Sequence, residues 1–174
     1  ALYAARGDSD GVHLCNLALV QHAATAGPER LMQAASPALA DMIAARSLFG
    51  IDVLGLELIG AGLALGADEF VSDVAALVGR SGRPAVISRV VDALLAVSVG
   101  SDERSRSTLR AALAITVAGG DFALGSTVLE ALGDHHAARA QRAVAALCFR
   151  QAGLYAERVG QSERAAALML SALR

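Results

Sequence analysis

Apolar residues recur along the chain with the spacing of amphipathic helices, and short clusters of Gly, Asp and Ser interrupt them. Alternating apolar and polar runs bounded by turns, which would predict strands, are weak. The pattern predicts helices over 1–6, 9–25, 28–47, 50–65, 68–79, 83–98, 102–118, 121–132, 135–159 and 162–173. We therefore expect an all-α protein.

Several of these helices begin at residues suited to a first turn. Pro28 and Pro84 each lie in the first turn of an expected helix, where the missing N–H would have had no intrahelical partner. Ser162 precedes the last helix and offers a side-chain oxygen to the first free N–H groups. These residues predict where three of the helices start.

The interruptions share a sequence pattern. In each of "LGADEF", "VGSDER" and "LGDHHA" an Asp follows a glycine within two residues. The glycines of these breaks are Gly66, Gly100 and Gly133, and the two intervals between them are nearly equal. A glycine with positive φ ends a helix, and the residues after it start the next one. The spacing predicts helix pairs that repeat about every 34 residues, with a break at Gly133.

The closing segment places small and large residues in a fixed order. It runs Phe149, Gly153, Gly160, Ala165, Met169, Ala172 and Leu173. This order resembles the tetratricopeptide repeat, with Gly153 in the middle of the first helix, Gly160 at the turn and Ala165 early in the second. The resemblance implies a right-handed α-solenoid of stacked antiparallel hairpins. Small residues at these positions would let the helix backbones approach closely.

Elsewhere the resemblance is degenerate. Val71 and Ser105 stand where Ala165 stands in the last hairpin, and the proline that usually follows the second helix is absent. Degenerate arrays rich in Ala and Arg are similar in style to the helical regions of large bacterial LuxR-type, ATP-binding transcription regulators. This similarity implies a cytoplasmic effector- or partner-binding region, while other domains bind ATP and DNA. We expect residues 1–174 to form one helical-repeat domain, a fragment of a longer protein.

Composition excludes several classes of partner. Hydrophobic residues make up 55% of the chain, mostly Ala, Leu and Val, yet no stretch of about 20 residues is uncharged enough to span a bilayer. The formal net charge is −2, which gives no basic face for DNA, RNA or anionic membranes. All fifteen basic residues are arginine, which suggests a GC-rich coding bias.

Catalytic and metal-binding patterns are missing from the sequence. His135 and His136 are adjacent on an expected helix start, point in different directions and therefore chelate one metal poorly. We expect them to be solvated or to cap the helix. Cys15 and Cys148 lie in apolar contexts and are expected to be buried free thiols. We predict a protein that is not an enzyme and holds no metal or cofactor.

Two arginines are the best polar candidates for a binding site. Arg106 and Arg110 are four residues apart, share one helix face and form a pair that could clamp a carboxylate or phosphate. The same spacing rules allow Arg106 to pair instead with Asp102 or Glu103. Both interpretations remain open at the sequence level.

The function we expect is a module that binds a protein or peptide partner, or a small effector, in a groove of the array. The alternative is a compact helical bundle that senses a small apolar ligand. In that alternative the run "GLELIGAGLALG", residues 55–66, would line an internal pocket. Exposed Ala and Leu faces would also allow two copies of the chain to pair.

Overall fold

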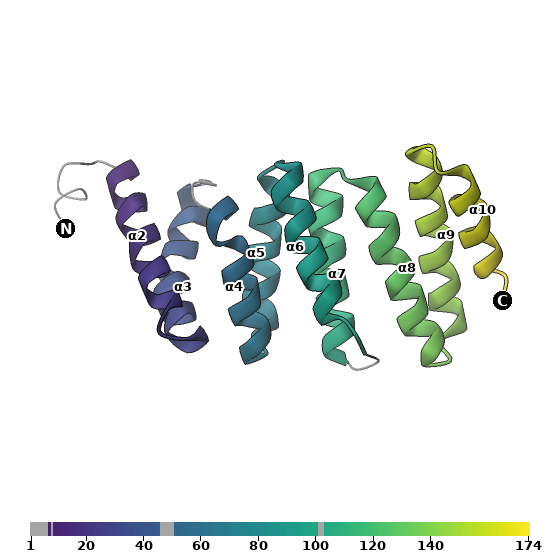
Figure 1. Cartoon of the computed structure of the whole chain (residues 1–174), viewed down its shortest axis with the longest axis horizontal. Coiled ribbons are helices and arrows are strands. Elements are labelled where there is room, and N and C mark those ends of the chain that lie inside the picture. The colour runs from purple at the N-terminus through teal and green to yellow at the C-terminus, as the bar shows by residue number, and fades with distance from the viewer. Residues whose placement is uncertain (1–6, 8, 46–50, 101–102) are drawn as a thin grey trace. The chain divides into compact units, whose positions relative to one another are not determined.

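Helices account for all the regular secondary structure in the described part of a computed structural model, which covers residues 7, 9–45, 51–100 and 103–174. The helix expected over 1–6 lies outside these residues. The described helices, drawn in Figure 1, are α2 (Ser9–Ala24), α3 (Pro28–Ala45), α4 (Ile51–Leu65), α5 (Asp68–Arg80), α6 (Pro84–Val97), α7 (Glu103–Gly119), α8 (Phe122–Ala138), α9 (Arg142–Arg158) and α10 (Ser162–Ser171). The all-α prediction is confirmed.

By its internal contacts the chain divides into two compact units, Ala1–Ser81 and Gly82–Arg174. In the first unit α2 packs on α3, α3 on α4 and α4 on α5. In the second unit each helix from α6 to α10 packs on the next one along the chain. That residues 1–174 form a single domain stays a prediction.

Glycines let α4 approach α5 closely in the first unit. A Cβ at Gly62 would lie 2.6 Å from Cγ2 of Val71, and one at Gly55 would lie 2.9 Å from Cγ2 of Val78. Both valines are buried, so the space beside each glycine is already filled. These two glycines of the run 55–66 therefore support close packing of α4 on α5.

One hydrophobic cluster of the second unit lies where α8, α9 and α10 meet. It contains Leu129, Ala145, Phe149, Ala152, Ala156, Ala165 and Leu168. Most of these side chains are no larger than leucine, so the helix axes can come close. The buried hydroxyl of Ser126 on α8 donates a hydrogen bond of 2.9 Å to the carbonyl of Ala152 on α9, which fixes the two helices against each other.

One turn geometry recurs at regular intervals in the second unit. Gly120, Ala140 and Gly160 all have positive φ and are evenly spaced along the chain. At each turn the next residue donates its N–H to the carbonyl five residues before it; that of Gln161, for example, lies 2.9 Å from the carbonyl oxygen of Ala156. This is the hydrogen-bond pattern of a Schellman helix end. Successive helices therefore reverse direction through the same turn.

The break expected at Gly133 was wrong. α8 continues through Gly133 to Ala138, and the reversal comes at Ala140. Gly133 is buried, and a Cβ there would lie 2.7–2.9 Å from three ring carbons of Phe149. Glycine is required at position 133 because a side chain would clash with Phe149. Gly133 does not have the positive φ that favours glycine at a turn. The turn therefore recurs after each of α7, α8 and α9. The interval from Gly100 to Gly133 is not the distance between two turns, because Gly133 lies inside α8.

The predicted helix starts are largely confirmed. α3 begins at Pro28 and α6 at Pro84, each as its first helical residue. Ser162 is itself the first residue of α10 and Gln161 precedes it, without a side-chain hydrogen bond that caps the helix. The cap that the structure does show belongs to Asp121, whose carboxylate accepts a 3.0 Å hydrogen bond from the N–H of Leu124.

Candidate partner-binding surface

The two arginines predicted as an anion clamp both lie on α7, in different surroundings. Arg106 pairs with Glu103 through Nη2, the i, i+3 alternative that the spacing allowed. Its Nε atom is buried and has no hydrogen-bond partner among the described residues. Arg110 is exposed and forms no ion pair with any described residue. Of the two guanidinium groups, that of Arg110 is therefore the more available to an anion.

The C-terminal end of α8 brings a buried histidine to this region. His135 is buried, and Nη1 of Arg139 lies 2.7 Å from its Nε2. Burial is the main cause that lowers the pKa of His135 from its usual value, and the charges of Arg139, His136 and Arg106 lower it further. A backbone hydrogen bond with Gly100 opposes this shift. The lowered pKa favours the neutral ring, which can accept a hydrogen bond from Arg139.

The expectation that both histidines are solvated or cap a helix start was wrong. His136 is also buried, and its Nδ1 lies 2.6 Å from Oε1 of Gln141 in the turn that follows α8. The pair stands in the last turn of α8, because this helix runs on past Gly133. Their side chains thus help to close the turn between α8 and α9.

The cysteines differ from each other. Cys15 is exposed, contrary to the expectation of two buried thiols, and Cys148 on α9 is partly buried. Burial raises the pKa of the Cys148 thiol above its usual value, while the charge of Arg110 opposes that rise. Arg110 of α7 therefore lies close enough to act on α9. Within the described residues no three His, Cys, Asp or Glu side chains are grouped to hold a metal ion.

The small residues of the last hairpin lie where α9 meets α10. Gly153 is buried, and a Cβ there would lie 3.1 Å from Cε of Met169 and 3.2 Å from the carbonyl oxygen of Ala165. Ala172 packs against the same core. Gly160 has a φ of 78°, and a Cβ there would meet nothing within 4 Å, so its role is conformational.

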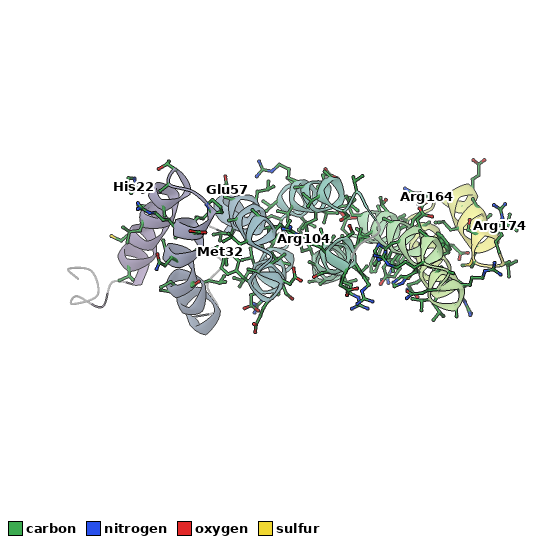
Figure 2. All side chains as sticks on the ribbon, turned by 90° about the horizontal axis from the view of Figure 1, so that it is seen from below. His22, Met32, Glu57, Arg104, Arg164 and Arg174 are labelled. Carbon is green, nitrogen blue, oxygen red and sulfur yellow. The ribbon has the colours of Figure 1, made fainter. Side chains whose placement is uncertain are left out.

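Arg164 of α10 connects two helices that are not adjacent along the chain. Its Nη2 lies 2.7 Å from Oε2 of Glu130 and 3.1 Å from Oγ1 of Thr127, both on α8. The residue is labelled in Figure 2. Because this arginine is already paired with protein groups, it is a structural residue of the hairpin. Arg150 on α9, by contrast, is exposed and has no partner in the described part of the chain.

An apolar face on α9 was not predicted from the sequence. Val144, Leu147 and Leu154 are 42%, 65% and 44% exposed, and we call them the α9 outer face. Leu147 and Leu154 are seven residues apart, two helical turns, and so project from the same side. The buried residues of α9 lie on the opposite side of the helix. The spacing could have been found in the sequence, but only the structure tells which side of α9 is covered.

The chain matches no protein-family model, no curated protein and no solved structure. None of the described helices is both long enough and apolar enough to cross a membrane. The residues themselves are therefore the basis of any assignment of function.

Proposed function

We propose that the chain is a non-catalytic helical-repeat module that binds a protein or peptide partner, in the regulatory region of a cytoplasmic bacterial transcription regulator. The observation that carries this proposal is the turn repeated at Gly120, Ala140 and Gly160. Helices joined by one turn geometry stack in one direction and leave long outer faces open to partners.

The repeat is of the tetratricopeptide type in its use of small residues, but it differs in length. Gly120 and Gly160 enclose two helices, α8 and α9, and this interval is longer than the roughly 34 residues of a tetratricopeptide pair. We therefore propose a longer helix hairpin that uses the same close contacts, with Gly153 and Ala165 at the crossing. Binding of a partner to an outer face would cause small movements between hairpins. These movements would transmit the binding event to attached ATP- and DNA-binding domains.

The packing of α4 favours this function over the sensing of a small apolar ligand. The alternative depended on a pocket along residues 55–66, and Val71 and Val78 fill the space beside two glycines of that run. A polar binding surface remains available instead, around Arg110 and Arg150. Both guanidinium groups are exposed.

Thermal unfolding of the purified chain tests the proposal directly. A ligand that binds only the folded state raises the midpoint in proportion to the logarithm of its concentration. We expect members of a diverse peptide panel to raise the midpoint and a panel of small apolar compounds to leave it unchanged. The reverse result would favour the ligand-sensing alternative. Sequencing of the gene on both sides tests the regulatory role, since it should encode ATP-binding and helix-turn-helix segments.

A further inference from the structure

The exposed side of α9 differs chemically from the exposed sides of most helices in globular proteins. Its centre is occupied by Leu147 and Leu154, one above the other, and Val144 lies one turn before Leu147. Burying apolar side chains of this size removes them from water, which is favourable, so three of them on one stripe favour a partner.

The helices α7, α8 and α10 do not repeat this stripe. Counted from the glycine or alanine of each preceding turn, the positions that match the α9 outer face carry polar, charged or small residues, with one leucine. These residues are Arg104, Ser107 and Ala114 on α7, Leu124, Thr127 and Asp134 on α8, and Arg164, Ala167 and Arg174 after the turn at Gly160. The stripe is therefore a property of α9 and does not follow from the repeat.

The stripe is flanked by positive charge on both sides. Arg150 lies on α9 itself, beside Leu147 and Leu154 on the helix surface. On the other side Arg110 of α7 reaches the neighbourhood of Cys148, the residue next to Leu147. Both arginines are exposed and neither is ion-paired with a described residue. The one acidic residue of α9, Glu157, lies two helical turns beyond Arg150 on the same side, so the positive charge is concentrated around Leu147. A complementary surface would carry carboxylates on both sides of an apolar stripe.

We propose that the α9 outer face binds an acidic amphipathic helix of a partner protein. The apolar side chains of the partner lie on Leu147 and Leu154, and its carboxylates meet Arg150 and Arg110. This inference rests on the proposed function and adds the chemistry of the partner.

Selection from a library of displayed random peptides of about five helical turns (~18 residues) provides the test. The purified wild-type chain is the bait, and the affinities of the enriched peptides are then measured by fluorescence anisotropy. We expect enrichment of peptides with apolar residues at three- and four-residue spacing flanked by Asp and Glu. Peptides of the same composition in permuted order should not bind.

Matched variants locate the binding site. Leu147→Gln with Leu154→Gln, and separately Arg150→Glu, should each weaken the enriched peptides about tenfold or more, by loss of apolar burial and of charge complementarity. Leu170→Gln, at a leucine 61% exposed on α10, and Arg89→Glu on α6 should leave affinity unchanged. A peptide with Lys in place of its acidic residues should bind Arg150→Glu better than the wild type. Tighter binding of the Lys peptide by the Arg150→Glu variant would exclude misfolding as the cause of its weaker binding to acidic peptides.

Each other result has a definite meaning. Enriched peptides that are basic or uncharged, or whose affinity is unchanged by the α9 variants, would overturn this inference and leave the proposed function standing. If no peptide is enriched, both fail. Binding to anionic phospholipid vesicles, or self-association in sedimentation, that is lost in the Leu147→Gln, Leu154→Gln variant would assign the face to a membrane or a second copy and also overturn it.

Discussion

The contact between α4 and α5 in the first unit and that between α8 and α9 in the second both depend on glycine, but they are filled by different side chains. Gly62 faces the branched side chain of Val71, whereas Gly133 faces the flat ring of Phe149. In both places the glycine lies inside a helix, where it costs about 1 kcal/mol relative to alanine. The close approach of the neighbouring side chain offsets this cost.

The two regions differ more in where the glycines stand along the chain. In the first unit Gly55 and Gly62 belong to one helix and lie two helical turns apart. In the second unit Gly133 and Gly153 belong to successive helices, each at the same position relative to its preceding turn. The first arrangement joins one pair of helices, while the second can continue from helix to helix. This difference is why we place the repeat in the second unit.

The largest effect is expected for Gly133→Ala. Three ring carbons of Phe149 would lie within 2.9 Å of the new methyl group, and a buried ring cannot easily move. We expect the free energy of unfolding to fall by about 1–3 kcal/mol, a typical cost of overpacking. Urea denaturation followed by circular dichroism measures it. A variant as stable as the wild type would show that this contact is loose.

Gly62→Ala should have a smaller effect of the same sign. Its new methyl group meets one carbon of Val71 at 2.6 Å and one of Phe70 at 3.1 Å. The restricted χ1 of valine makes this contact hard to relieve, which destabilises the variant. The higher helix propensity of alanine partly offsets that effect, so the expected loss is about 1 kcal/mol. Gly60→Ala on the same helix is the matched control: nothing lies within 4 Å of its Cβ, and it should stabilise the chain. Equal effects at both positions would contradict the packing argument.

The turns offer a reciprocal exchange. Ala140 has a φ of 57°, a region that suits glycine, and Gly160 has a φ of 78°. We expect Ala140→Gly to raise the free energy of unfolding slightly and Gly160→Ala to lower it by roughly 1 kcal/mol. Both are read from the same denaturation curves. If the two substitutions changed stability in the same direction, the three turns would not be equivalent.

A modest dependence on pH is expected from His135. Burial, Arg139, His136 and Arg106 lower its pKa in the folded chain, so the unfolded chain takes up the proton first. Stability should therefore be complete above a pH of about 6.5 and decline as the pH falls below that value. The melting temperature at pH 5.5 should lie below that at pH 7.5, and His135→Gln should reduce the difference. An unchanged difference would assign the effect to other groups.

Much of the fold could be predicted from the sequence because helix starts and ends carry local signals. Pro28 and Pro84 start helices as expected, and Gly160 occupies a turn. The turn at Ala140 could not be predicted, since alanine rarely has a positive φ and so gives no signal for a turn. Gly133 followed by Asp134 matches the sequence pattern of a helix end although it lies inside α8. Propensity alone cannot tell a glycine needed for conformation from one needed for its missing side chain.

The candidate surface could be predicted only where it depends on one helix. The pairing of Arg106 with Glu103 follows from i, i+3 spacing and was among the alternatives. The burial of His135 and the approach of Arg110 to Cys148 depend on packing between helices, which no local pattern reveals. The α9 outer face was missed for the same reason.

A double-mutant cycle between Gly133 and Phe149 tests most directly the claim that missing side-chain bulk holds successive helices together. The free energies of unfolding of Gly133→Ala, Phe149→Leu and the double variant are compared with that of the wild type. We predict that Gly133→Ala costs at least ~1 kcal/mol less when residue 149 is leucine, because the smaller side chain leaves room for the methyl group. Strict additivity of the two substitutions would contradict the account.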